Sequence, residues 1–129
     1  MKPKVYLAHS SEFDYKNDLY LPIKRSSLPS LYEFIYLLDN PQNLPNTKDM
    51  IQTFQVVIGE ISYPSTGAGI EIGWADAFGI PIILIHNQSY SPPDYYKTLS
   101  SYIIEYDNSE KIPDLIATPL KLISSINLA

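Results

Sequence analysis

The amino-acid sequence predicts an α/β fold, namely a small doubly wound (flavodoxin/Rossmann-like) five-stranded parallel sheet with helices on both faces. Two observations lead to this prediction. Short apolar runs of the kind found in strands buried on both faces recur along the chain, and segments of helical character lie between them. The length of 129 residues and the apolar fraction of 45% suit a single domain, residues 1–129, with one hydrophobic core.

Five segments are expected to be strands: residues 4–8, 31–38, 56–61, 81–85 and 102–106. The first of them, KVYLA, stops abruptly at His9-Ser10-Ser11, as a buried parallel strand does where a loop begins. The second, LYEFIYLL, is rich in aromatic and branched residues, which favours a strand. A helix is the alternative for this segment, because leucine and glutamate suit both states.

Helical segments are expected before and between the later strands. A helix within residues 19–28 would begin near Pro22, because proline suits a first turn, and residues 12–18 would form a loop over the site. A short helical piece is expected over residues 95–101.

Two further helices are predicted from capping residues and apolar spacing. Residues 47–54 form a short helix that Asn46 or Thr47 can cap. From residue 110 onward, apolar residues recur at near-helical spacing, which predicts a closing helix interrupted at Pro119.

The composition excludes several classes of function. The net charge is −5 and the only basic cluster is Lys24-Arg25, so a nucleic acid polymer or a membrane surface is not an expected partner. The chain has no cysteine, and His9 and His86 lack the spacing of a metal site, so no metal is expected. The first residues are interpreted as a strand and not as a signal peptide, and no segment approaches a membrane span. A cytoplasmic enzyme or binding protein is therefore the default expectation.

The segment SYPSTGAG, residues 62–69, should lie where a ligand binds. In doubly wound sheets ligands bind outside the carboxyl ends of the strands, and this segment links the third strand to a helix. Gly67 and Gly69 would let backbone amides approach a ligand, and the helix start would add partial positive charge. Small residues at a helix start also allow tight packing on a sheet, so the pattern alone leaves both interpretations open.

Further loops should meet at the same edge of the sheet, since parallel strands all end there. The expected site combines the loops at His9-Ser10, at Asp39-Asn40, at residues 62–69 and from Asn87 onward. His9 is a candidate hydrogen-bond partner for a ligand, although an ordinary histidine at a loop end is the alternative.

Glu71 is the candidate catalytic residue of this region. It lies between Ile70 and Ile72 just inside the helix, and a capping box would require serine or threonine at the position of Ala68. A carboxylate held ionised beside donor amides suits attack on an electrophilic sugar carbon, as in glycosidases. On the pattern alone, a glutamate that merely favours the helix dipole is an equal alternative.

Residues 56–75, VVIGEISYPSTGAGIEIGWA, followed by GIPIILI, resemble the core of the nucleoside 2-deoxyribosyltransferase-like family. The spacing is most similar to the family branch that hydrolyses 2'-deoxynucleoside 5'-monophosphates, and VYLAHS near the amino end resembles the first strand and loop of that branch. The likeness covers the first strand and residues 56–85.

The resemblance implies roles for five residues. Glu71 matches the nucleophile that attacks C1' of deoxyribose, and Tyr6 matches a tyrosine near that carboxylate. Ser10 and Ser65 fall where the hydrolase branch surrounds the 5'-phosphate, although Ser65 could also cap the helix. Asp49 is the candidate for the acid that protonates the departing base, although an aspartate near a helix start is common.

Two positions depart from the family pattern, and Glu12 affects the expected substrate. Gln55 replaces the usual aspartate at the start of the third strand, and Glu12 replaces an arginine of the hydrolase branch. A glutamate there would repel a phosphate, so a free nucleoside remains a possible substrate.

The expected function is therefore cleavage or transfer at the N-glycosidic bond of a 2'-deoxynucleoside or its 5'-monophosphate. A hydrolase would complete the reaction with water and a transferase with a second base. The resemblance implies that no metal or organic cofactor is needed and that the chain assembles as a homodimer or a higher homo-oligomer. The alternative is a non-catalytic module that binds nucleosides or nucleotides on the same fold.

Overall fold

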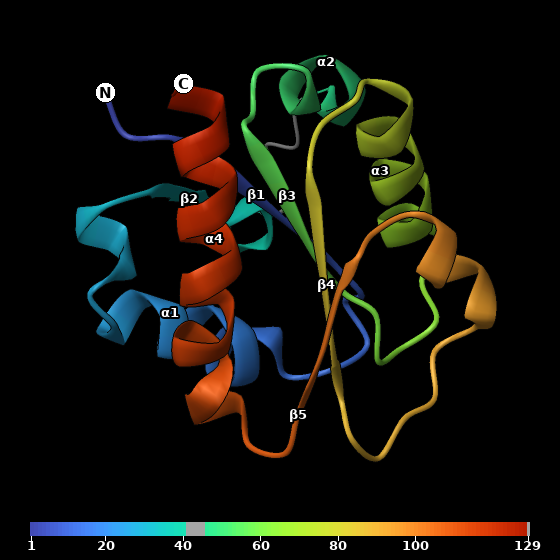
Figure 1. The fold of residues 1–129 in the computed structure, drawn as a ribbon. Helices are drawn as coiled ribbons and strands as arrows, with labels where there is room; N and C mark the ends of the chain where they lie inside the picture. Colours follow the sequence, from blue (N-terminus) through green and yellow to red (C-terminus); the bar gives the residue numbers. More distant parts are fainter. Residues whose placement is uncertain (41–45, 129) are drawn as a thin grey trace.

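The computed structural model describes residues 1–40 and 46–128, and its centre is a five-stranded sheet with the order β2-β1-β3-β4-β5 (Figure 1). The strands are β1 (Lys4–His9), β2 (Glu33–Ile35), β3 (Val56–Glu60), β4 (Ile82–Asn87) and β5 (Tyr102–Tyr106). Every neighbouring pair is parallel. This order is that of flavodoxin-like doubly wound sheets, and it confirms the predicted fold class.

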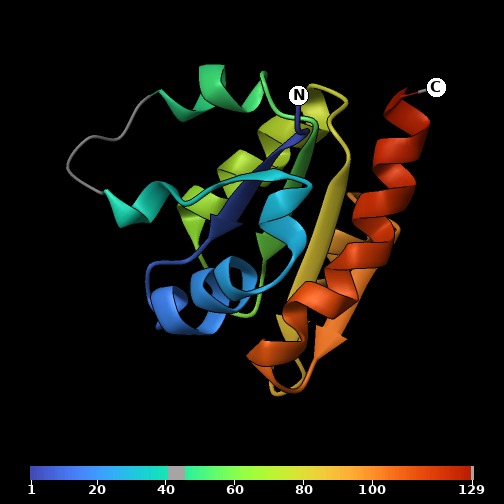
Figure 2. The same ribbon diagram turned by 90° about the vertical axis from the view of Figure 1, so that its left-hand side faces the viewer.

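Four α-helices cover the two faces of the sheet: α1 (Leu21–Arg25), α2 (Thr47–Ile51), α3 (Thr66–Ala77) and α4 (Ile112–Leu128). Figures 1 and 2 show α1 and α4 against one face and α2 and α3 against the other. Shorter helical turns lie at Lys16–Tyr20, Leu28–Ser30, Leu37–Asp39, Asp94–Thr98 and Ser109–Lys111. No helix in the described ranges has the length and apolar character that crossing a membrane requires.

Alternation along β1 divides the core into two clusters. Val5 and Leu7 point toward α1 and α4, whereas Tyr6 and Ala8 point toward α2 and α3. Because β1 lies between β2 and β3, and the chain crosses from one side of it to the other, the carboxyl end of β1 is the topological switch point of the sheet. A residue on the α3 side of β1, such as Tyr6, is therefore well placed to reach a ligand there.

The second strand and the first helix begin and end at other residues than predicted. The segment 31–38 does contain a strand, but only Glu33–Ile35 pair with β1, and a 3₁₀ turn follows. Pro22 lies in the first turn of α1 as expected, but a π-helical turn at Lys16–Tyr20 precedes it, so the expected loop over residues 12–18 ends early.

The predicted interruption of the last helix at Pro119 is wrong, because α4 continues through this residue. A proline inside a helix removes one backbone hydrogen bond and costs about 3 kcal/mol. Ile116, Leu120 and Ile123 on the same helix are buried against the sheet, and their packing holds the helix together on both sides of Pro119.

Candidate active site

A cavity of about 400 Å³ lies at the switch point of the sheet, a size within the usual range for small-molecule sites. It takes its walls from β1 and the loop after it, the 3₁₀ turn after β2, and the first turns of α2 and α3. Its lining residues are Tyr6, Leu7, His9, Ser11, Leu37, Leu38, Thr47, Ser65, Gly67, Ala68 and Glu71. We call it the Tyr6–Glu71 cavity.

Tyr6 and Glu71 meet in this cavity although 65 residues separate them. The Tyr6 hydroxyl donates a hydrogen bond to Oε2 of Glu71. The tyrosine itself is buried, and its ring stacks on that of Phe54 with centroids 5.5 Å apart. The donor is thus fixed by the core, and it holds the carboxylate in one place.

The cavity perturbs the ionisation of both groups. Burial raises the pKa of Glu71, and the hydrogen bond from Tyr6 opposes this rise. Burial and the negative charge of Glu71 raise the pKa of Tyr6, so the hydroxyl keeps its proton and remains a donor. Within the described ranges Glu71 forms no ion pair. Its carboxylate is therefore held by a neutral donor and is not neutralised by a cation.

The start of α3 supplies the next wall of the cavity. Ser65 caps the helix, because its Oγ accepts a hydrogen bond from the Ala68 amide at 3.2 Å, as the sequence suggested. A Cβ atom on Gly67 or Gly69 would meet no atom within 4 Å, so helix packing does not require either glycine. Gly67 borders the Tyr6–Glu71 cavity, whereas Gly69 borders an adjacent cavity that also includes Ser65.

His9 and Ser10 are turned inward at the end of β1. His9 lines the cavity, but its Nδ1 lies 2.8 Å from the Ser10 carbonyl oxygen and its Nε2 lies 2.6 Å from the Tyr20 hydroxyl. Ser10 is buried, and its Oγ accepts a hydrogen bond from the Glu12 amide at 2.9 Å. The serine of this loop that lines the cavity is Ser11 and not Ser10, and the sequence analysis missed it.

Asp49 does not reach the cavity. It lies exposed on α2, and its amide donates a hydrogen bond to the side chain of the capping residue Asn46 at 3.3 Å. Thr47 on the same helix does line the cavity. The structure therefore provides no contact between Asp49 and the other candidate residues.

Two of the loops expected to join the site lie elsewhere. Asp39 pairs with Lys24 at 2.6 Å and does not line the cavity, and Asn87 borders a different cavity. Leu37 and Leu38 line the site in place of residues 39–40, because β2 ends at Ile35 and not at residue 38. The loop-forming residues that signal the end of a strand begin only at Asp39 in the sequence, so they could not predict that β2 ends at Ile35.

The sequence analysis also missed a buried carboxylate, Glu60, at the end of β3. It accepts hydrogen bonds from the Ser62 amide at 2.6 Å, from the Ser62 hydroxyl at 2.8 Å and from the Tyr106 hydroxyl. The Ser62 hydroxyl in turn accepts a hydrogen bond from the Asn87 amide at 2.7 Å. Burial raises the pKa of Glu60, and these hydrogen bonds oppose the rise. This Glu60 clasp anchors the loop that leads to Ser65.

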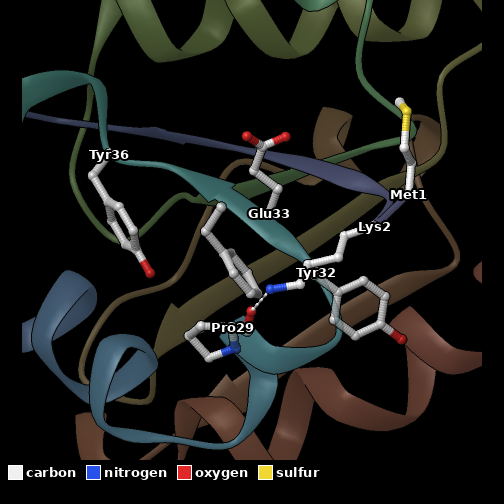
Figure 3. Close-up of a pocket in the computed structure, with 7 residues that line it drawn as sticks. Met1, Lys2, Pro29, Tyr32, Glu33 and Tyr36 are labelled. Carbon is white, nitrogen blue, oxygen red and sulfur yellow. Dashed lines mark hydrogen bonds between the residues drawn. The ribbon is translucent and has the colours of Figure 1, made fainter.

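Another cavity, of about 440 Å³, lies beside the edge strand β2 (Figure 3). Tyr32 and Glu33 line it together with Lys2, whose amine donates a hydrogen bond to the Pro29 carbonyl oxygen at 2.8 Å. It shares no lining residue with the Tyr6–Glu71 cavity. The described residues include no group of three or more His, Cys, Asp or Glu side chains that could hold a metal ion.

The solved structures that are similar to this chain include two proteins of known description. The CMP N-glycosidase BcmB from Clostridium botulinum has 26% sequence identity and a TM-score of 0.63, over 88% of this chain and 98% of that chain. The signal receiver domain of a LuxO repressor protein from Vibrio parahaemolyticus has 16% identity and a TM-score of 0.60, over 99% of this chain and 97% of that chain. This second similarity concerns the fold alone. No protein-family model and no curated protein matches the sequence.

Proposed function

We propose that this chain cleaves or transfers at the N-glycosidic bond of a 2'-deoxynucleoside or its 5'-monophosphate, with Glu71 as the nucleophile. One observation carries the proposal: the Glu71 carboxylate borders the cavity at the switch point, held by the Tyr6 hydroxyl and paired with no cation in the described chain. The likeness to a CMP N-glycosidase supports the same class of bond.

In the proposed reaction an oxygen of Glu71 attacks C1' of the sugar and forms an ester. The bond between C1' and the base nitrogen breaks, and the base leaves with the bonding electron pair and takes up a proton. Water or the ring nitrogen of a second base then attacks C1', loses a proton that balances the one taken up by the departing base, and releases the Glu71 carboxylate. The transition state carries positive charge on the sugar, which an unpaired carboxylate stabilises.

The 5' end of the substrate is proposed to lie at the start of α3. Ser65 and Gly67 border the cavity there, and the free amides of a helix start favour a phosphate. Glu12, which the resemblance marked as an unfavourable neighbour for phosphate, has an exposed side chain and does not line the cavity. A 5'-monophosphate bound at this end of the cavity would therefore not contact the Glu12 side chain.

Two other assignments come from the resemblance. Asp49 is proposed to protonate the leaving base, although the structure provides no contact that supports this role. Assembly as a homodimer or larger is also proposed, and light scattering in solution measures it directly. Gln55, in contrast, lies immediately before β3, where its Oε1 accepts a hydrogen bond from the Lys4 amide at 2.6 Å. That position is at the opposite end of the strand from the cavity.

The test is release of free base, measured by chromatography, from deoxynucleosides, their 5'-monophosphates, cytidine and CMP. We expect release from deoxy substrates, loss of it in Glu71→Gln, and no loss in Asp76→Asn, which changes an exposed carboxylate on the same helix. Mass spectrometry of the quenched reaction should find the sugar attached to Glu71. Binding without release from any substrate would instead show a non-catalytic binding module, and undiminished release by Glu71→Gln would overturn the mechanism.

A further inference from the structure

Tyr20 connects two walls of the Tyr6–Glu71 cavity without lining it. It is the last residue of the helical turn Lys16–Tyr20 and is buried beneath His9, with the two rings edge to face and their centroids 5.1 Å apart. Its hydroxyl contacts both His9 Nε2, at 2.6 Å, and the amide nitrogen of Leu38, at 3.3 Å. His9 and Leu38 each line the cavity, His9 at the end of β1 and Leu38 in the 3₁₀ turn after β2.

The donor and the acceptor can be assigned in each of these hydrogen bonds. The Ser10 carbonyl oxygen can only accept, so Nδ1 of His9 carries a proton. Burial lowers the pKa of His9, so the ring is neutral and Nε2 accepts the proton of the Tyr20 hydroxyl. The Tyr20 oxygen then accepts from the Leu38 amide. The chain of hydrogen bonds runs from Leu38 through Tyr20 and His9 to Ser10.

We propose that Tyr20 is a positioning residue of the site, whose hydroxyl holds His9 as a neutral imidazole and ties it to the Leu38 wall. Both ring nitrogens of His9 are occupied within the protein, so His9 acts on the substrate as an uncharged surface of fixed orientation. This matters for the proposed function, on which the catalytic part of the inference rests. A protonated imidazole in the same cavity would oppose the positive charge that develops on the sugar.

The chain offers a matched pair of variants for the test. Tyr20→Phe removes the connecting hydroxyl and keeps the ring. Tyr36→Phe is the control. The ring centroids of Tyr20 and Tyr36 lie 5.0 Å apart, and the Tyr36 hydroxyl is buried without a hydrogen-bond partner in the described structure. Both changes delete one oxygen from the same aromatic cluster, and only one of them breaks the connection between His9 and Leu38.

The first measurement is the nitrogen-15 NMR spectrum of the histidines, which needs no substrate. The chain has only His9 and His86, so His86 is an internal reference. In the wild type we expect His9 as the tautomer protonated at Nδ1, with Nε2 shifted as a hydrogen-bond acceptor. Tyr20→Phe should move the Nε2 signal to that of a free acceptor or mix the two tautomers, and Tyr36→Phe should leave it unchanged. An unchanged His9 spectrum in Tyr20→Phe, or an equal change in both variants, overturns the inference.

The second measurement is kcat/KM for base release. One hydrogen bond between neutral groups corresponds to a roughly two- to tenfold effect, so we expect a fall of that size in Tyr20→Phe and the wild-type value in Tyr36→Phe. An unchanged kcat/KM in Tyr20→Phe would overturn the catalytic part. If the wild type releases no base at all, the proposed function fails, and the NMR result still decides whether Tyr20 holds His9.

Discussion

Replacing Tyr6 by phenylalanine removes one hydroxyl from the cavity and leaves the ring stacked on Phe54. The hydroxyl donates to Glu71 and thereby favours the ionised carboxylate, whereas burial disfavours it. Without the donor, burial is unopposed and the pKa of Glu71 rises further. A larger fraction of the nucleophile is then protonated, and unreactive, at any pH near the titration of this group.

The size of the effect follows from the contact. A hydrogen bond to a charged group contributes about 1.5–3 kcal/mol, and 1.36 kcal/mol corresponds to one pH unit in a titration midpoint. In Tyr6→Phe we therefore expect the acidic limb of the pH profile for kcat/KM to move by roughly one to two pH units toward higher pH. Because the ring and its packing remain, the rate should approach that of the wild type once Glu71 is fully ionised.

The assay is base release over a range of pH for the wild type, Tyr6→Phe and the control Tyr36→Phe. Recovery at high pH separates an effect on ionisation from a general disruption of the site, which would lower the rate at every pH. The reasoning is refuted if the acidic limb of Tyr6→Phe stays in place or moves to lower pH. In that case either Glu71 is not the group that titrates or Tyr6 does not stabilise its charge during catalysis.

Three further predictions concern stability and substrate preference. Because the pKa of Glu71 is raised in the folded protein, its ionisation lowers the stability of the fold as the pH rises through that pKa. Glu71→Gln should therefore unfold at a higher temperature than the wild type in alkaline buffer, and the difference between the two unfolding temperatures should shrink in acid. Gly59→Ala should lower the free energy of unfolding by about 1–3 kcal/mol, because the added Cβ would lie 2.7 Å from Cδ1 of Ile72 in the core. Gly73→Ala, at an open helical position, should raise the free energy of unfolding by roughly 0.5–1 kcal/mol. Denaturant titrations of both variants measure these changes. Ser65→Asp keeps a capping oxygen but adds negative charge at the start of α3, so it should raise KM for 5'-monophosphates more than for nucleosides, and equal changes for both would place the phosphate elsewhere.

The sequence predicted the sheet well because its strands are buried on both faces. A run such as IILI leaves little choice other than a central strand, and Ile83 and Leu84 are indeed fully buried. The boundaries were less predictable where several residue types suit more than one state. Glu33–Ile35 pairs with β1 over only three residues, and no local pattern shows where that pairing ends.

The sequence predicted only part of the candidate site, because the remaining residues are brought to it by packing between distant segments. The contact of Tyr6 with Glu71 was anticipated only because the family resemblance covers both segments and implies a tyrosine near the carboxylate. The roles of Thr47 and Leu38 as wall residues depend on the path of the chain between β2 and β3, which composition does not encode. The link from Tyr20 to His9 depends on the packing of several aromatic rings, and Tyr20 is one of eleven tyrosines.

The Glu60 clasp has a consequence for the order of folding. Its donors come from the loop after β3 and from Tyr106, the last residue of the last strand, and the Asn87 amide at the end of β4 bonds the Ser62 hydroxyl. During synthesis the carboxylate of Glu60 is therefore made well before its partner hydroxyl on β5 exists. Until β5 joins the sheet, Glu60 has only the two donors of Ser62 and lacks the Tyr106 hydroxyl. Because a buried carboxylate with a missing donor is costly, the loop that carries Ser65 should be held firmly only after β5 is in place. The proposed base release would then reach its full rate late in refolding, after the bulk of the secondary structure has formed.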